Sequence, residues 1–183
     1  MGHLDPESSL HLVPELRWLR HTIIERALTK GDYILSGGAH SDFYIDKFRL
    51  FSDPKVLRRI ARLFTPVVAD FEPDLIGGTE LGGVILATAV SQMTGLPMIV
   101  VRKQPKSYGA FANDFVEGPC HRGQRVLLLE DVVTSGHEVL LAKTRLEELG
   151  LEVIVYAVVN RGLAPIKSLV QLPLPRGELT PDN

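Results

Sequence analysis

The feature that most constrains the fold of this chain is a repeated order of short apolar segments and helical patterns. Apolar segments typical of strands occupy residues 74–77, 98–101, 125–129 and 153–159, and helical patterns occupy residues 82–94 and 137–149. A glycine follows each helical pattern, as expected where a helix ends in a left-handed residue. Continuous apolar strands that alternate with helices predict an α/β fold with a central, mainly parallel sheet flanked by helices. Ligands of such sheets bind at the carboxyl ends of the strands, where we expect the function to lie.

The N-terminal part of the chain follows a different pattern. Apolar positions at helical spacing predict a helix over residues 15–29, which we expect to end at Gly31. Residues 33–51 mix aromatic, glycine and polar residues, and this mixture predicts a hairpin or two short strands. We therefore expect an N-terminal extension over residues 1–14 and a single domain over residues 15–172.

Three further segments complete the predicted organisation. Asp53 and Pro54 predict a helix start, because aspartate caps helices and proline fits their first turn, and this helix is expected to reach about Phe71. Residues 103–124 form a connection that is long for a compact domain, and such loops are usually functional. The tail over residues 173–183 has few apolar anchors and is expected to be disordered.

Composition argues against several classes of function. The chain has 183 residues, which suits one core, and a formal net charge of -2 without a long run of like charge, which argues against a nucleic-acid partner. Its one cysteine, Cys120, cannot form a disulfide within the chain. No apolar run is long enough to span a membrane and the N-terminus lacks the pattern of a signal peptide, so we expect a cytoplasmic protein without a membrane partner.

The strongest functional signal is the segment over residues 126–138. An apolar strand ends in Glu130 and Asp131, and after two valines the hydroxyl residues and glycine of 134–136 precede a predicted helix. Backbone N–H groups, hydroxyls and the helix dipole at such a turn favour a phosphate. The two acids would repel a phosphate, so they are better suited to hydroxyl groups of a ribose attached to it.

This segment resembles the motif that binds phosphoribosyl pyrophosphate (PRPP) in the type I phosphoribosyltransferases. The resemblance implies their fold, with a small N-terminal hood over residues 15–51. It also implies that Glu130 and Asp131 hold the ribose hydroxyls and favour the positive charge that develops on the ribose. The implied PRPP contacts on the turn are Val132, Val133, Thr134, Ser135, Gly136 and His137, the last of which replaces the usual hydroxyl residue.

A basic segment opens the long connection. Arg102, Lys103 and Lys106 place three cations at the end of a predicted strand, although such a segment taken alone is more often a solvated surface. Residues 102–109 resemble the loop of the orotate phosphoribosyltransferases, with Tyr108 at the position of that family's histidine. In that family the loop is mobile, closes over the active site and often reaches the neighbouring subunit. The resemblance implies a homodimer, and it implies that the three cations are catalytic and stabilise the departing pyrophosphate.

A glycine-rich turn over residues 77–83 also joins a predicted strand to a predicted helix. In the family this turn binds the pyrophosphate, which implies that Thr79 and Glu80 contact PRPP. The resemblance further implies Mg²⁺ as a cofactor, held mainly by PRPP and by no protein ligand directly.

The base would lie beneath the hood. Residues 36–46 resemble the hood segment of the orotate enzymes, and the resemblance implies that Tyr44 and Thr134 contact the base. Arg161 follows the last predicted strand, and its planar guanidinium suits the carboxylate of orotate.

The expected function is therefore transfer of the phosphoribosyl group of PRPP to orotate, giving orotidine 5'-monophosphate and pyrophosphate in pyrimidine nucleotide biosynthesis. Four residues depart from the best-known orotate pattern, namely Leu35, Glu80, Leu81 and Tyr108. They leave two alternatives open, a phosphoribosyltransferase for another base such as a purine and a regulator that binds PRPP without catalysis.

Overall fold

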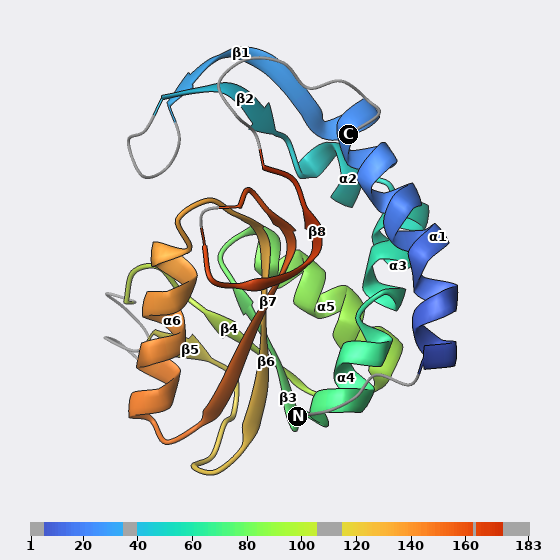
Figure 1. The fold of residues 1–183 in the computed structure, drawn as a ribbon. Helices are drawn as coiled ribbons and strands as arrows, with labels where there is room; N and C mark the ends of the chain where they lie inside the picture. Colours follow the sequence, from blue (N-terminus) through green and yellow to red (C-terminus); the bar gives the residue numbers. More distant parts are fainter. Residues whose placement is uncertain (1–5, 35–39, 106–114, 163, 174–183) are drawn as a thin grey trace.

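The computed structural model describes residues 6–34, 40–105, 115–162 and 164–173, and for residues 6–12 it describes the backbone alone. A twisted central sheet has helices on both faces, and a hairpin lies above one of its ends (Figure 1). None of the described helices is long and apolar enough to cross a membrane.

The described part of the main sheet has six strands in the order β5-β4-β3-β6-β7-β8. In chain order these are β3 (Leu75–Thr79), β4 (Met98–Val101), β5 (Val116–Glu117), β6 (Arg125–Val133), β7 (Glu152–Asn160) and β8 (Lys167–Gln171). Every neighbouring pair is parallel except β4 and β5, which are antiparallel. The prediction of a mainly parallel sheet is confirmed.

Alternate residues of β6 belong to two separate apolar clusters. Leu127 and Leu129 pack with α5 (Gly82–Thr94), α3 (Pro54–Arg62) and α4 (Thr65–Phe71). Val126 and Leu128 pack on the other side, with α6 (His137–Glu148). Since successive side chains of a strand point to opposite faces, the helices cover both faces of the sheet.

The N-terminal residues form the hood. The chain passes through α1 (Pro6–Thr22), a π-helical turn η1 (Ile23–Ala27), strands β1 (Leu28–Ile34) and β2 (His40–Ile45), and the short helix α2 (Phe48–Phe51). Strands β1 and β2 pair in antiparallel fashion and lie over the carboxyl ends of the main strands (Figure 1). Glu15 of α1 accepts two hydrogen bonds from Arg59 of α3, at 2.6 and 3.0 Å, and these bonds tie α1 to the core.

Several predicted boundaries were wrong in the first part of the chain. The first helix begins at Pro6, before residue 15, and Gly31 lies inside β1 instead of ending that helix. Asp53 does cap α3, by accepting from the backbone N–H groups of Lys55 and Val56. The helix expected to run to Phe71 is divided, because Pro66 in the first turn of α4 has no N–H to continue the preceding helix.

Three differences concern the second part of the chain. Strand β6 continues through Asp131 to Val133, because β7 provides a parallel partner as far as Asn160. Strand β8 was not predicted, and it makes β7 an inner strand. The connection over residues 103–124 contains the short strand β5, while most of the predicted tail over 173–183 lies outside the described residues.

Candidate active site

Glu130 and Asp131 lie near the carboxyl end of β6, between β3 and β7. Both side chains are buried, with Glu130 9% and Asp131 5% exposed. Since their carboxyl groups point to opposite sides of the strand, each has its own set of partners.

The Glu130 carboxyl group is held by neighbouring donors. Its Oε2 accepts a hydrogen bond from the Thr79 hydroxyl at 2.6 Å, and its Oε1 accepts from the Asp131 backbone N–H at 3.1 Å. Burial, and next the charge of Asp131, raise the pKa of Glu130 to about 8. Burial thus favours the uncharged form of the Glu130 carboxyl group in the free protein.

Asp131 is contacted from two further elements. Its Oδ2 lies 3.1 Å from the Nζ of Lys47, which follows β2 in the hood. Burial lowers the pKa of the Lys47 ammonium, but Asp131, together with Tyr44 and Glu130, raises it, and the net pKa is raised. A Cβ on Gly82, at the start of α5, would lie 1.8 Å from the same Oδ2, so only glycine lets α5 approach this carboxylate.

The phosphate turn predicted at residues 134–136 lies between β6 and α6. Gly136 has a left-handed φ of +76°, and a Cβ there would lie 2.6 Å from Ile166. The Ser135 hydroxyl accepts a hydrogen bond from the His137 backbone N–H at 3.4 Å. The first backbone N–H groups of α6 lie at this turn and have no acceptor within the helix. Such groups can bind an anion.

Asn160 orders the chain beside the phosphate turn. Its amide donates to the carbonyls of Ala164 and Ile166 at 2.8 and 2.9 Å, and its side-chain oxygen accepts from the Gly162 N–H at 2.8 Å. Ala164 and Ile166 of this loop lie beside Gly136, so Asn160 supports the turn through the loop that it orders.

The basic segment begins beside the glycine-rich turn. The Glu80 carboxylate accepts a hydrogen bond from the Lys103 backbone N–H at 3.2 Å, and it lies 3.6 Å from the guanidinium of Arg102. The guanidinium also lies 3.5 Å from Glu117 of β5. Glu80 therefore holds the start of the segment over residues 102–105.

The structure brings predicted residues of three elements to one small pocket at the strand ends. Among the described residues it is lined by Thr79, Val101, Arg102, Lys103, Glu130, Glu138, Leu141, Ala142 and Arg145. Its volume of about 10 Å³ admits no more than one water molecule.

Arg161 joins the hood to the end of β7. It is 9% exposed, its guanidinium donates to the Ser41 hydroxyl of β2 at 2.8 Å, and its buried Nε has no hydrogen-bond partner among the described residues. Burial lowers the pKa of this guanidinium. Tyr44 lies on the other face of β2, where its ring is 5.5 Å from that of Tyr33 and 39% of the residue is exposed.

Two groups of residues need separate mention. Lys106, Tyr108 and Leu35 lie outside the described residues, so the site is seen here without them. Lys47 was not predicted as a site residue, although it contacts Asp131. The available signal was the alternation of β2, which continues from Ser41 through two buried apolar residues to Lys47.

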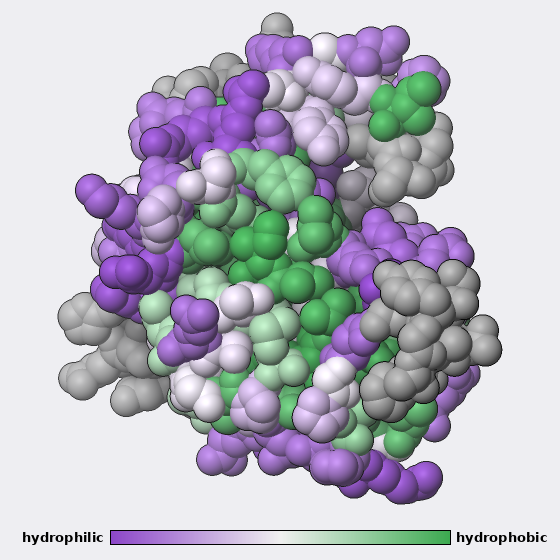
Figure 2. Space-filling view, turned by 180° about the vertical axis from the view of Figure 1, so that it is seen from behind, coloured by the Kyte–Doolittle hydropathy of each residue, from purple (hydrophilic) through white to green (hydrophobic). Residues whose placement is uncertain are grey.

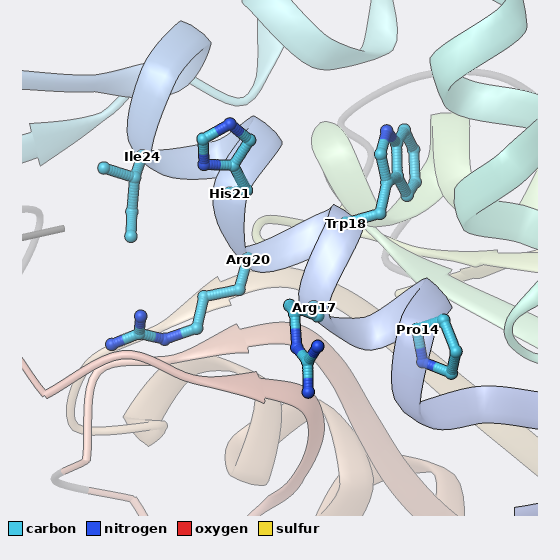
Figure 3. A pocket seen from close by; sticks show the side chains of 6 residues that line it. All are labelled: Pro14, Arg17, Trp18, Arg20, His21 and Ile24. Atoms are coloured by element: carbon cyan, nitrogen blue, oxygen red, sulfur yellow. The ribbon is translucent and has the colours of Figure 1, made fainter. Parts of the chain in front are cut away.

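A separate pocket of about 490 Å³ lies on α1 and the turn after it, lined by Pro14, Arg17, Trp18, Arg20, His21 and Ile24. Arg17 and Arg20 extend to one side of the helix and Trp18 points to another (Figure 3). The Trp18 ring is covered by the guanidinium of Arg59 at 3.7 Å. These polar groups do not converge on one point, so we assign the pocket no part in the chemistry.

The described residues include no group of three or more His, Cys, Asp or Glu side chains that could hold a metal ion. Asp131 is a buried carboxylate, the kind of group that binds Mg²⁺, but its Oδ2 is already paired with Lys47. Diphosphate and ribose oxygens fit the need of Mg²⁺ for oxygen ligands better than this set does.

Known proteins share this arrangement. Residues 49–168 match the family model of the phosphoribosyl transferase domain. An orotate phosphoribosyltransferase of Thermococcus gammatolerans is 42% identical over 135 residues, covering 73% of this chain and 70% of that protein. The crystal structure of the Mycobacterium tuberculosis orotate phosphoribosyltransferase in complex with PRPP has a TM-score of 0.68 and 28% identity, covering 87% of this chain and 97% of that one.

Sheet order, acid pair and phosphate turn thus occur in a chain whose sequence matches this domain over most of its length. The chain belongs to the phosphoribosyltransferase family, and its curated relatives place it among the orotate phosphoribosyltransferases. The predicted family and fold are confirmed.

Proposed function

We propose that this protein transfers the 5-phosphoribosyl group of PRPP to orotate, giving orotidine 5'-monophosphate and pyrophosphate. The observation that carries the proposal is the acid pair on β6 beside the turn at residues 134–136, with Arg161 directly after the neighbouring strand β7. N1 of orotate forms a bond to C1 of the ribose while the bond from C1 to the diphosphate oxygen breaks. The electron pair of the broken bond leaves on pyrophosphate, and the N1 proton is lost.

The proposed role of each site residue follows from its charge and its hydrogen-bonding groups. Thr134, Ser135 and Gly136 would hold the 5'-phosphate, with Val132, Val133 and His137 completing the turn. Asp131 would face the ribose hydroxyls and favour the positive charge that develops on the ring. Glu130 would take part as a hydrogen-bonding group, because burial favours its uncharged form.

The leaving group and the base would have separate contacts. Arg102, Lys103 and Lys106 would surround the departing pyrophosphate, and Thr79 and Glu80 would contact PRPP from the adjoining glycine-rich turn. Mg²⁺, held mainly by PRPP, would supply charge neutralisation of the diphosphate. Arg161 would bind the orotate carboxylate, with Tyr44 and Thr134 also placed in the base site by this proposal.

A homodimer in which residues 102–109 reach the neighbouring site is part of the proposal. Its support is α5, whose outer side carries the partly buried Val84, while Leu81 in the preceding turn is 63% exposed. Beside these two apolar residues, the exposed positions of α5 are the polar Thr88 and Gln92. Apolar surface gathers in the middle of one face of the molecule, within a polar border (Figure 2).

Light scattering after size exclusion tests this assembly. We expect the mass of a dimer, and we expect Thr88→Arg, a change at an exposed position of α5, to give a monomer. A monomeric unaltered protein at assay concentration would contradict the dimer.

The cytoplasmic location expected from the sequence belongs to the same proposal, and cell fractionation tests it.

The activity is tested by following the ultraviolet absorbance of orotate with PRPP and Mg²⁺. We expect loss of orotate that requires PRPP, and no comparable reaction with adenine, guanine, hypoxanthine or uracil. Consumption of a purine in place of orotate would indicate a transferase for another base. PRPP binding by calorimetry without turnover of any base would indicate a regulator.

A further inference from the structure

The hood contacts the ends of two neighbouring strands at once. Ser41, near the start of β2, accepts a hydrogen bond from Arg161 after β7, and Lys47, just after β2, lies 3.1 Å from Asp131 of β6. Strands β6 and β7 pair directly over this stretch. The segment from Ser41 to Lys47 therefore runs from Arg161, to which the proposed function assigns the base, to Asp131, to which it assigns the ribose.

Lys47 is a hood residue whose ammonium group contacts Asp131 of the acid pair. Its side chain is 26% exposed, and that of its partner Asp131 is 7% exposed. A partly buried ammonium needs an anion nearby, because its loss of hydration is otherwise uncompensated. In the free protein Asp131 fills this need.

The same contact opposes the proposed chemistry. Asp131 favours positive charge on the ribose only to the extent that its own charge is available, and a lysine at 3.1 Å offsets that charge. Removing Lys47 from Asp131 without another anion would leave a partly buried cation unpaired. A ligand that brings a negative charge beneath the hood would pair with Lys47 and would also leave the charge of Asp131 available to the ribose.

We propose that Lys47 is a specificity-determining residue that selects an anionic base by exchanging Asp131 for the negative charge of that base. The inference rests on the proposed function and extends it. A base whose carboxylate is bound by Arg161 brings its negative charge beneath the hood and draws Lys47 away from Asp131, which then faces the ribose with its charge available. A neutral base offers no such anion and leaves the pair between Lys47 and Asp131 intact.

The test compares orotate with uracil, which has the same ring without the carboxylate. In Lys47→Met we expect kcat/KM for orotate to fall about a hundredfold, as for the loss of a hydrogen bond to a charged group. For uracil we expect kcat/KM to stay the same or to rise, since Asp131 is no longer paired. Lys47→Arg, which keeps the charge, should retain most of the preference for orotate.

Lys30→Met is the matched control. Lys30 is an exposed lysine of the same hood, with its Nζ 5.9 Å from the Phe43 ring, and the change removes one positive charge as Lys47→Met does. The ratio of the two kcat/KM values should be unchanged in this control. If Lys47→Met does not fold, Lys47→Gln tests the same ratio with an uncharged donor in place of the ammonium.

The outcomes separate this inference from the proposed function. If kcat/KM for orotate and for uracil fall by the same factor in the Lys47 variants, Lys47 only anchors the hood and the inference is overturned. If the unaltered protein turns over no orotate, the proposed function itself is wrong. A fall confined to orotate supports both.

Discussion

The Thr79 hydroxyl donates a hydrogen bond to Oε2 of Glu130 across 2.6 Å and so connects the ends of two paired strands, β3 and β6. Both residues are buried. This bond lowers the pKa of Glu130, whereas burial and the charge of Asp131 raise it. The hydroxyl therefore limits how far Glu130 departs from the titration of an ordinary carboxyl group.

Thr79→Val removes this donor at nearly constant side-chain volume. We expect kcat/KM for PRPP to fall about tenfold, because a buried hydrogen bond contributes about 1 kcal/mol or somewhat more. Thr79→Ser keeps the hydroxyl and should retain most of the activity in the same steady-state assay. Equal activity of the valine variant and the unaltered protein would show that the bond has no part in catalysis.

The raised pKa of Glu130 predicts how stability depends on pH. Between its usual value of 4.5 and about 8, the unfolded chain releases the Glu130 proton while the folded protein keeps it. The contribution of Glu130 to stability is thus fully present below 4.5 and is lost as pH rises through about 8. Urea unfolding at several pH values in this range should show a smaller loss of stability for Glu130→Gln than for the unaltered protein. Parallel curves for the two proteins would contradict the assignment.

Gly82→Ala places a Cβ where the Asp131 carboxylate lies. We expect displacement of that carboxylate and a fall in kcat of about 10²–10³, the usual effect of removing one electrostatic contact to a transition state. Gly123→Ala is the control for replacing a glycine outside the site, because a Cβ at Gly123 would meet no atom within 4 Å, although its φ is +89° and Gly82 has no left-handed φ. The control should lose about 1 kcal/mol of stability and keep its kcat. A fully active Gly82→Ala protein would mean that Asp131 is not needed in its present position.

Lys106→Ala tests the basic loop, whose central part lies outside the described residues. We expect kcat to fall about 10²–10³ while the affinity for PRPP, measured by calorimetry, changes much less. The reason is that an interaction formed mainly with the departing pyrophosphate contributes to the transition state more than to the bound substrate. Unchanged turnover in this variant would refute a catalytic role for Lys106.

Sequence patterns predicted the inner part of the sheet well, for clear physical reasons. Helix α5 was expected over residues 82–94 and is observed there, because apolar residues fill it and Gly95 ends it with a left-handed φ of +75°. The turn at Gly136 was expected from its position between an apolar strand and a helical pattern, and its φ of +76° agrees with that reading. Local signals were sufficient in both places.

Other features depend on partners that are distant along the chain. The five residues of β8 lie in a segment with Pro165 and Pro173 near its ends, and only pairing with β7 makes them a strand. Gly31 would end a helix by local preference, yet it lies in β1 because β2 returns beside it. The alternation of β2 gives the face on which Lys47 lies, but its contact with Asp131 depends on a strand far along the chain and was not predicted.

The hydrogen bond between Arg161 and Ser41 joins residues that are 120 positions apart, so no short fragment of the chain contains the site. The unfolded chain then has no appreciable affinity for PRPP, and binding shifts the folding equilibrium by mass action. The thermal midpoint of the protein should therefore rise with PRPP concentration even in variants that have lost turnover. The thermal midpoint of this protein therefore shows whether PRPP is bound. It can distinguish a variant that binds PRPP without turnover from a variant that no longer binds PRPP.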